Sequence, residues 1–324
     1  MKTCLVVEPI HPTGIAMLDA AGVRVRALGL AERSRVAAEI ASVEAVITRS
    51  SGLSASEIEA GERLLVIGNH GVGTNRIDVA AASRLGIAVV NTPGANAQSV
   101  AELTLALALA VAWKVPGADR AARAADTGFK FQNRFGELSG KTLGIVGFGD
   151  IGRRVAAIFR GAFGSRVLVW SPSVPAAEVA AAGCEASVSL DDLLARTDIV
   201  SVHTGWSPEK AGMIGAAELS RMQPGSSLLV TSRGGIVDEA ALAEALRSGH
   251  LGGAGLDVLA QEPLAENHPL RDVPNLVLTP HIGGSSQEGL ERTAISLVRG
   301  VLDVLAGERP EHLVDPAMWP RRRG

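Results

Sequence analysis

The chain has 324 residues, of which 47% are hydrophobic and 20% are charged. Its formal net charge is −3 at pH 7, and the basic run from Arg321 to Arg323 is interpreted as a solvated tail. This composition is typical of a folded globular protein and argues against disorder and against a basic surface for nucleic acid. A single hydrophobic core rarely serves more than roughly 250–300 residues, so we expect two domains.

The sequence carries no signal for export or for a membrane. Cys4 and Cys184 are the only cysteines and cannot form a disulfide framework, and the N-terminal segment lacks the apolar core of a secretory signal. The most apolar stretch, residues 100–113, contains Glu102 and is shorter than the roughly 20 residues that span a bilayer. We therefore expect a buried helix there and a cytoplasmic protein that binds neither a membrane nor nucleic acid.

Short apolar runs alternate with helical patterns in the first part of the chain, at residues 5–7, 23–25, 45–47, 64–67 and 88–90. This alternation predicts a parallel sheet covered by helices. The apolar helix at 99–113 follows, and then a segment that holds Phe129, Phe131 and Phe135. These aromatic residues belong either to a local core or to a contact with a second subunit.

The same alternation restarts at Thr142 and continues through RVLVW, DIVSVH, SSLLVTS, GGAGLDV and NLVLTPH, which predicts a second sheet. A last amphipathic pattern at 289–305 has no strand after it and is expected to return to the first domain. The fold class is therefore α/β, with two Rossmann-like domains. We predict a discontinuous, flavodoxin-like substrate-binding domain at 1–99 plus 286–324, and a dinucleotide-binding Rossmann domain at 100–285.

A glycine-rich motif, GxGxxG, is formed by Gly147, Gly149 and Gly152 between a predicted strand and a predicted helix. In this setting the glycines permit a tight turn, the approach of a pyrophosphate and close packing of helix on strand. The amides near Asp150 and Ile151 would then face the phosphates at the helix N-terminus. The motif predicts a dinucleotide site.

The expected acidic partner of the ribose hydroxyls is replaced by Ser171, in VLVWSPSV. No Arg or Lys lies between Val167 and Ala195 to hold a 2′-phosphate either. The choice between NAD(H) and NADP(H) is therefore left open, and Ser171 could also simply cap the turn before Pro172.

Three polar residues follow strand-like runs in the second half: Arg233 in LLVTSRGGIVDE, Glu262 in GLDVLAQEP and His281 in LTPHIGG. Ligands of open parallel sheets gather at the carboxyl ends of the strands, so these side chains are expected to converge on one cleft. An imidazolium can protonate the oxygen that becomes negative as a hydride arrives, while a neighbouring carboxylate orients the ring and favours its charged form. A guanidinium can hold a substrate carboxylate through two parallel bonds. The set predicts carbonyl reduction.

Motifs along nearly the whole chain resemble those of the D-isomer-specific 2-hydroxyacid dehydrogenases: TRSSG near Arg49, GNHGVGTNRID, VVNTPGANAQSVAE, GKTLGIVGFGDIG, TSRGGIVDE, DVLAQEP and TPHIGG. TRSSG and GVGTNRID look closest to the phosphoglycerate dehydrogenase branch. The resemblance implies hydride transfer between NAD(H) or NADP(H) and C2 of a small 2-hydroxy or 2-oxo acid. It also implies a homodimer, for which residues 99–135 are the candidate interface.

By this resemblance, Arg233 binds the carboxylate and carbonyl of the substrate, His281 is the acid/base, and Glu262 sets the protonation of His281. The loop of Gly71, Val72 and Gly73 would offer backbone amides to the substrate carboxylate. Arg49 either reaches an anionic substrate or is a plain surface or ion-paired arginine. Together with His281, the residues expected to border the nicotinamide and its ribose are His203, Thr204, Thr231, Ser232, Asp257 and Gly283.

The segment HTGWSPEKAGMI departs from the family pattern, with Gly205 where Pro is common and Lys210 where Thr is common, so contacts from this loop are left open. No HExxH or CxxC motif occurs, and we expect no metal site; the histidines other than His203 and His281 are interpreted as loop or surface residues. One alternative function is a dinucleotide-sensing scaffold or corepressor of the same fold. Another is a formate-type dehydrogenase, in which an amide replaces Glu262.

Overall fold

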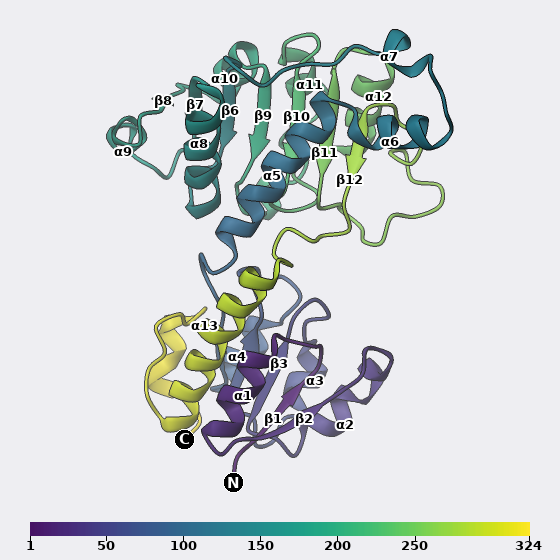
Figure 1. Ribbon diagram of the computed structural model, residues 1–324. Coiled ribbons are helices and arrows are strands. Elements are labelled where there is room, and N and C mark those ends of the chain that lie inside the picture. Colours follow the sequence, from purple (N-terminus) through teal and green to yellow (C-terminus); the bar gives the residue numbers. More distant parts are fainter. The chain divides into compact units, whose positions relative to one another are not determined.

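The computed structural model describes the backbone of residues 1–324 and every side chain except that of residue 30. The chain forms two compact units, one made of Met1–Asn96 with Gly284–Gly324 and the other of Ala97–Gly283. Each unit is built around one parallel sheet with helices packed on it (Figure 1). This confirms the α/β class with two parallel sheets.

The first unit contains a five-stranded sheet of order β2-β1-β3-β4-β5 in which every pair is parallel. The central strands β3 and β4 are buried at every residue, which is why they appear in the sequence as continuous apolar runs. The strands are β1 Thr3–Val6, β2 Arg24–Ala27, β3 Ala45–Thr48, β4 Val66–Asn69 and β5 Ala88–Val90. The helices are α1 Pro12–Ala20, η1 Leu30–Arg35, α2 Val36–Ile40, α3 Ala55–Glu59, α4 Val79–Arg84, α13 Gln287–Ala306 and η3 Pro316–Arg321.

The C-terminal segment belongs to the first unit. The amphipathic pattern at 289–305 forms α13, which packs on β4 and α1, and Leu297 and Val301 of this helix share a buried cluster with Val66. The arginine run after it was expected to be a solvated tail; Arg321 and Arg322 are exposed, but Arg323 is bound to the first unit. The backbone N–H of Arg323 donates to the carbonyl oxygen of Gly86 over 2.8 Å, and its guanidinium donates to the carbonyl oxygen of Gly61 over 2.8 Å.

The second unit contains a seven-stranded parallel sheet of order β12-β11-β10-β9-β6-β7-β8. Its strands are β6 Leu143–Val146, β7 Val167–Trp170, β8 Glu185–Ala186, β9 Ile199–Val202, β10 Ser227–Val230, β11 Gly253–Leu256 and β12 Leu276–Leu278. Its helices are α5 Ala97–Ala112, α6 Val115–Arg123, α7 Phe129–Gln132, α8 Asp150–Phe163, α9 Ala176–Ala181, α10 Leu190–Arg196, η2 Pro208–Lys210, α11 Ala216–Arg221 and α12 Glu239–Arg247. The strand order reverses between β6 and β9, where open α/β sheets bind their ligands.

The most apolar stretch of the sequence forms α5, which packs on β10, β11 and α8 through a face that includes Leu107, Ala108 and Val111. In the described part of the chain no single helix has the length and apolar character needed to cross a membrane. Only α5 and α6 taken together, with a bend of 58° between them, meet that test.

Candidate active site

A tight glycine turn joins β6 to α8. Gly147 has a φ of +95°, and a Cβ at this position would lie 2.7 Å from a backbone nitrogen of the loop after β9, so the turn requires glycine. A Cβ on Gly152 would lie 2.3 Å from the carbonyl oxygen of Gly147. At Gly149, in contrast, a Cβ would meet nothing within 4 Å. The backbone is therefore open beside Asp150 and Ile151 at the start of α8, and this turn fits the pyrophosphate of a dinucleotide.

Ser171 is the first residue after β7. Its Oγ accepts a hydrogen bond from the backbone N–H of Phe148 over 3.2 Å, which ties it to the glycine turn. The guanidinium of Arg153 lies 4.6 Å from the centre of the Phe148 ring and forms an ion pair with Glu178 over 2.8 Å. The end of β7 thus presents a hydroxyl in place of the carboxylate that normally favours NAD over NADP.

His203 and Thr204 follow β9 and lie against the glycine turn, since a Cβ on Gly147 would be 2.9 Å from the carbonyl carbon of His203. The Nε2 atom of His203 is hydrogen-bonded to Ser201 Oγ at 2.8 Å. Burial lowers the pKa of His203 to about 3, so the ring is neutral near pH 7. The hydroxyl of Thr204 accepts a hydrogen bond from Lys210 Nζ over 2.9 Å.

Thr231 and Ser232 follow β10 and are buried. The Thr231 hydroxyl is hydrogen-bonded to the Thr104 hydroxyl of α5 at 2.9 Å, which joins the end of the strand to the helix. The Ser232 hydroxyl is buried and has no partner among the described residues. A buried hydroxyl without a partner is costly, and a polar group of a bound ligand would satisfy it.

Arg233 comes next in the same loop. Its Nη1 donates to the carbonyl oxygen of Ser232 over 2.6 Å. A Cβ on Gly234 would lie only 1.9 Å from the carbonyl oxygen of Leu259, so this loop is pressed against the loop that carries Glu262. Burial lowers the pKa of the Arg233 guanidinium, while the negative charge of Glu262 opposes that shift. An arginine remains protonated under both influences, so the loop holds a desolvated positive charge.

Asp257 follows β11, is 2% exposed, and binds the loop that holds His281. Its Oδ1 accepts from Thr279 Oγ1 over 2.6 Å and from the N–H of Ile282 over 2.8 Å, and its Oδ2 accepts from the N–H of Gly283 over 2.8 Å. The carbonyl oxygen of Asp257 also accepts from the N–H of His281 over 2.9 Å. The carboxylate expected from the resemblance to line the nicotinamide site therefore directs these hydrogen bonds to the loop after β12.

His281 adopts a φ of +54°, which is rare for a residue with a side chain and costs about 1–3 kcal/mol. Its Nδ1 lies 3.0 Å from Glu262 Oε2, and the side chain is half-exposed. The other oxygen of Glu262 accepts from the N–H of Leu259 over 3.2 Å, which fixes the carboxylate. The Nε2 of His281 has no partner in the described part of the chain, so this nitrogen is available to a reactant.

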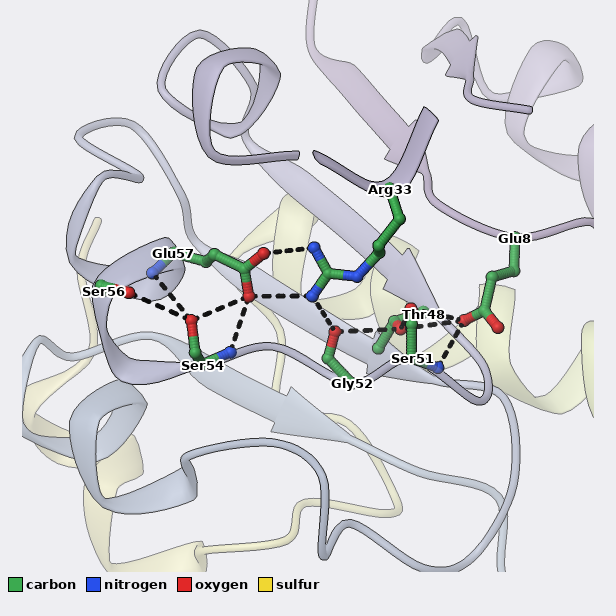
Figure 2. A network of polar contacts seen from close by, with 8 residues as sticks. All are labelled: Glu8, Arg33, Thr48, Ser51, Gly52, Ser54, Ser56 and Glu57. Atoms are coloured by element: carbon green, nitrogen blue, oxygen red, sulfur yellow. Dashed lines mark hydrogen bonds and ion pairs between the residues drawn. The ribbon is translucent and has the colours of Figure 1, made fainter. Parts of the chain in front are cut away.

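In the first unit, Arg49 lies in the loop after β3, and Glu8 holds that loop from the end of β1. Glu8 Oε2 accepts the backbone N–H of Arg49 over 2.7 Å, of Ser50 over 2.8 Å and of Ser51 over 3.0 Å. It also accepts the hydroxyls of Ser51 and Thr48, over 2.9 and 3.2 Å (Figure 2). Burial raises the pKa of Glu8, but the hydrogen bonds from Ser51, Arg49 and Ser50 outweigh it and leave the pKa below its ordinary value.

The guanidinium of Arg49 has a neutral partner: its Nη2 donates to Ser285 Oγ over 2.9 Å. None of the ion pairs between described side chains includes Arg49. Of the interpretations open from the sequence, an ion-paired arginine is therefore wrong, and a half-buried positive charge remains beside the loop.

The polar network continues from this loop to α3, as Figure 2 shows. The Gly52 carbonyl oxygen accepts from Thr48 Oγ1 over 3.4 Å and from Arg33 Nη2 over 3.2 Å. Arg33 forms an ion pair with Glu57, which also closes a capping box with Ser54 at the start of α3. The bonds from Arg33 lower the pKa of Glu57 to about 2 despite its burial. The loop after β3 is thus fixed at both ends.

The loop of Gly71, Val72 and Gly73 follows β4. Asn69 Nδ2 donates to the carbonyl oxygens of Gly71 and Gly73, over 3.0 Å each, and Asn91 Nδ2 donates to that of Val72 over 2.8 Å. The N–H groups of Val72 and Gly73 donate to no acceptor among the described residues, and Val72 is 42% exposed. The carbonyl oxygens of this loop are thus hydrogen-bonded to the protein, while two of its N–H groups are free to bind an anion. This is the arrangement of a backbone anion site.

His70 was expected on a loop or at the surface; it does lie in the loop directly after β4, but its side chain is buried. It is 7% exposed, and its Nε2 has no partner within the described structure. Burial, with a further contribution from the charge of Arg49, lowers the pKa of His70 to about 4. The residue is thus a neutral imidazole behind the loop of Gly71 to Gly73.

The sequence interpretation missed Glu8 and Asn69. Both stand at the carboxyl end of a strand, the criterion that pointed to Arg233, Glu262 and His281, so the signal was present in the sequence. It also left open the direction of Lys210, which turns back to Thr204. In the part of the chain that the structure describes, no three His, Cys, Asp or Glu side chains are grouped to hold a metal ion.

Comparisons with known proteins agree with this geometry. Residues 105–283 match the family model described as "D-isomer specific 2-hydroxyacid dehydrogenase, NAD binding domain". D-3-phosphoglycerate dehydrogenase of Mycobacterium bovis is 39% identical over 310 residues, which cover 95% of this chain and 58% of that relative. The chain thus spans little more than half the length of that protein. Glyoxylate reductase of Aeropyrum pernix is 41% identical over 259 residues, which cover 78% of this chain and 77% of the relative.

Among solved structures, the NADPH-dependent glyoxylate/hydroxypyruvate reductase of Sinorhizobium meliloti, in complex with citrate, superposes with a TM-score of 0.85. It is 26% identical, and the match covers 100% of both chains. The family model covers more than half of the chain, and the two relatives match well above 30% identity. The chain therefore belongs to the D-isomer specific 2-hydroxyacid dehydrogenase family.

Proposed function

We propose that this protein is an NAD(P)-dependent oxidoreductase that transfers a hydride between nicotinamide and C2 of a small D-2-hydroxy or 2-oxo acid. The observation that carries the proposal is the hydrogen bond of 3.0 Å between His281 Nδ1 and Glu262 Oε2, beside the desolvated charge of Arg233. The relatives described above are named as dehydrogenases and reductases, which supports an enzyme over a dinucleotide-sensing scaffold. Glu262 in place of an amide argues against a formate-type enzyme.

In this proposal the second unit binds the dinucleotide and the first unit contributes to the substrate site. The pyrophosphate binds along the turn from Gly147 to Gly152, and the ribose of the adenosine lies beside Ser171. The residues proposed to border the nicotinamide and its ribose are His203, Thr204, Thr231, Ser232, Asp257, His281 and Gly283. The unpartnered hydroxyl of Ser232 supports this assignment, because a buried donor at this strand end gains a partner from a ligand.

In this proposal, different residues of the chain bind the substrate and transfer the proton. Arg233 holds the carboxylate or carbonyl of the oxo acid through parallel hydrogen bonds. When bound, the reduced nicotinamide supplies the hydride that reaches C2. His281 Nε2 gives a proton to the carbonyl oxygen as negative charge develops there, and Glu262 accepts from Nδ1 and keeps the ring oriented. The amides of Val72 and Gly73 and the charge of Arg49 are proposed to bind the acid group of the substrate.

The test is the loss of reduced-nicotinamide absorbance with NADH and NADPH in parallel, against glyoxylate, pyruvate, hydroxypyruvate and phosphohydroxypyruvate. We expect turnover with at least one pair, and His281→Ala should lower kcat by about 10²- to 10⁴-fold while dinucleotide binding survives. His250→Ala is the matched control, because His250 precedes β11 at the opposite edge of the same sheet and bonds to the Leu219 carbonyl oxygen. Silence across the panel with dinucleotide binding intact would favour the scaffold.

We also propose a homodimer that forms through an aromatic patch of the second unit, composed of Trp113, Phe129, Phe131 and Phe135. The Trp113 and Phe135 rings stack with centres 6.2 Å apart, and Phe129 lies 6.1 Å from Phe135. Exposed fractions of 81% for Phe131, 47% for Trp113 and 38% for Phe135 favour a subunit contact over a local core. Light scattering should give a dimer that Trp113→Ser with Phe131→Ser converts to a monomer; a wild-type monomer at micromolar concentration would contradict this.

The proposed compartment is the cytoplasm. Cys4 and Cys184 are free and buried, and burial raises the pKa of Cys4 to about 12. Such thiols are unreactive and need no disulfide partner, which suits a reducing environment.

A further inference from the structure

The loop after β9 carries a lysine that folds back toward the strand instead of extending into solvent. Lys210 Nζ donates to Thr204 Oγ1 over 2.9 Å and to the carbonyl oxygen of Gly205 over 3.1 Å. The residue is half-buried, and no ion pair among the described side chains includes it. An ammonium has three N–H donors, so one donor and a full positive charge remain available at this place.

The place itself is the point where the strand order reverses. β9 and β6 are neighbours in the sheet, with β10 on one side of the pair and β7 on the other. In such sheets a dinucleotide lies across the crevice at the carboxyl ends of these two strands. The glycine turn after β6 touches the segment that Lys210 binds, since a Cβ on Gly147 would lie 2.7 Å from the backbone nitrogen of Thr204.

The glycine turn provides no cationic side chain to neutralise the charge of a pyrophosphate. The turn from Gly147 to Gly152 contains no Lys or Arg and brings the exposed carboxylate of Asp150. The two arginines that follow are engaged elsewhere: Arg153 pairs with Glu178 over 2.8 Å, and Arg154 donates to Gln98 over 3.2 Å. The helix N-terminus supplies N–H donors but only partial positive charge.

We propose that Lys210 binds the pyrophosphate of the dinucleotide through its remaining N–H donor, while its other two donors hold Thr204 and Gly205 in place. This rests on the proposed function, because it concerns the cofactor of the same site. It gives the departure from the family pattern at 210 a role, since a threonine hydroxyl brings no charge. The group recognised is the diphosphate itself, so NADH, NADPH and ADP-ribose should all depend on Lys210 to the same degree.

The experiment measures the dissociation constant of ADP-ribose by calorimetry for the full chain and for Lys210→Met, which keeps an unbranched side chain one atom shorter and removes its charge. We expect weaker binding by about tenfold or more, the usual effect of losing a hydrogen bond to a charged group. Lys210→Arg should recover most of the affinity. The wild-type affinity should fall with added NaCl more steeply than that of Lys210→Met.

Lys141→Met is the matched control, because Lys141 lies before β6 at the amino edge of the same sheet and pairs with Asp198 over 3.6 Å. Its ADP-ribose affinity should equal that of wild type. Binding by Lys210→Met within twofold of wild type would overturn the proposal, as would weakened binding that Lys210→Arg does not restore and that has the wild-type dependence on NaCl. If wild type itself bound no ADP-ribose and reduced no oxo acid, the proposed function would fail instead.

Discussion

Two loops, one in each unit, are each held by hydrogen bonds to a carboxylate, and the two carboxylates differ in burial and in how evenly their oxygens share these bonds. Glu8 at the end of β1 binds the loop after the neighbouring strand β3, and Asp257 at the end of β11 binds the loop after its neighbour β12. In both, a carboxylate accepts consecutive backbone N–H groups. Asp257, however, is 2% exposed and uses both oxygens, whereas the contacts of half-buried Glu8 fall mainly on one oxygen.

The loops differ in what they carry. The loop held by Asp257 keeps His281 at a φ of +54°, a conformation that the surrounding bonds must enforce. The loop held by Glu8 carries Arg49, whose charge can act over a longer range than a proton transfer permits. In our proposal the loop held by Asp257 positions the group that exchanges a proton, and the loop held by Glu8 positions a group that attracts an anion.

The sharpest test of this difference is Asp257→Asn. An amide cannot accept from both the Gly283 N–H and the Ile282 N–H while it satisfies its own N–H donors, so the loop should move and His281 should lose its position. We expect kcat to fall roughly 10²-fold and the free energy of unfolding to fall by about 2–4 kcal/mol. Steady-state kinetics and urea denaturation measure the two effects.

The control for that variant is Asp198→Asn. Asp198 Oδ2 accepts the N–H of Thr142 over 2.8 Å at the amino edge of the same sheet. It should lower stability and leave kcat within about twofold, because no reacting group depends on it. Equal losses of kcat in both variants would show that Asp257 acts only through general stability.

A smaller effect is expected from Glu8→Gln. The amide is a weaker acceptor for the N–H groups of Arg49, Ser50 and Ser51, so the KM for the oxo acid should rise about tenfold while kcat changes less than about twofold. Glu57→Gln removes a carboxylate at the other end of the same network and should lower stability without changing KM. If Glu8→Gln lowered kcat and left KM unchanged, the difference between the two loops would disappear.

A further test concerns pH rather than a loop, and each unit contributes one histidine. His70 and His203 have pKa values lowered to about 4 and about 3, chiefly by burial, against an ordinary value of 6.5. Both are neutral in the folded protein near pH 7, while the unfolded chain takes up their protons below pH 6.5. Their contribution to stability is therefore fully present above about pH 6.5 and is lost as pH falls toward 4 and 3, by roughly 1.4 kcal/mol per pH unit for each histidine.

Urea denaturation at pH 7.5, 6 and 5 measures this dependence. His70→Gln and His203→Gln should each reduce the dependence of the unfolding free energy on pH by the contribution of one histidine. This holds whatever the substitution does to stability at pH 7.5. An unchanged slope in His203→Gln would mean that His203 binds its proton equally in the folded and unfolded states, so that its pKa is not lowered on folding.

The sequence was sufficient for the parts of the fold that depend on local pattern. Apolar runs and turn residues located the strands, apart from the two-residue edge strand β8, which is too short to leave a pattern. The helix after the glycine motif begins at Asp150, earlier than the periodicity from Arg153 indicated. Helix ends are located less precisely than helix interiors by apolar spacing.

The sequence was insufficient where a contact joins distant segments. Arg323 was interpreted as part of a charged tail because no local pattern shows that it donates hydrogen bonds to the carbonyl oxygens of Gly61 and Gly86. His70 was correctly expected in a loop, but no local pattern shows that its side chain is only 7% exposed. At the candidate site, Arg233, Glu262 and His281 were found by their position after strands, whereas the anchoring roles of Glu8 and Asp257 depend on which strands are neighbours.

The packing of α13 on β4 also bears on how the chain is synthesised. The strands of the first unit leave the ribosome well before Leu297 and Val301, which cover Val66 of β4. At about 5–20 residues per second, the intervening residues 97–283 take roughly 10–40 s to add, and they form a separate compact unit. The N-terminal part of the chain is therefore made first, but its sheet is covered last. We expect the nascent chain to need protection while this sheet is uncovered.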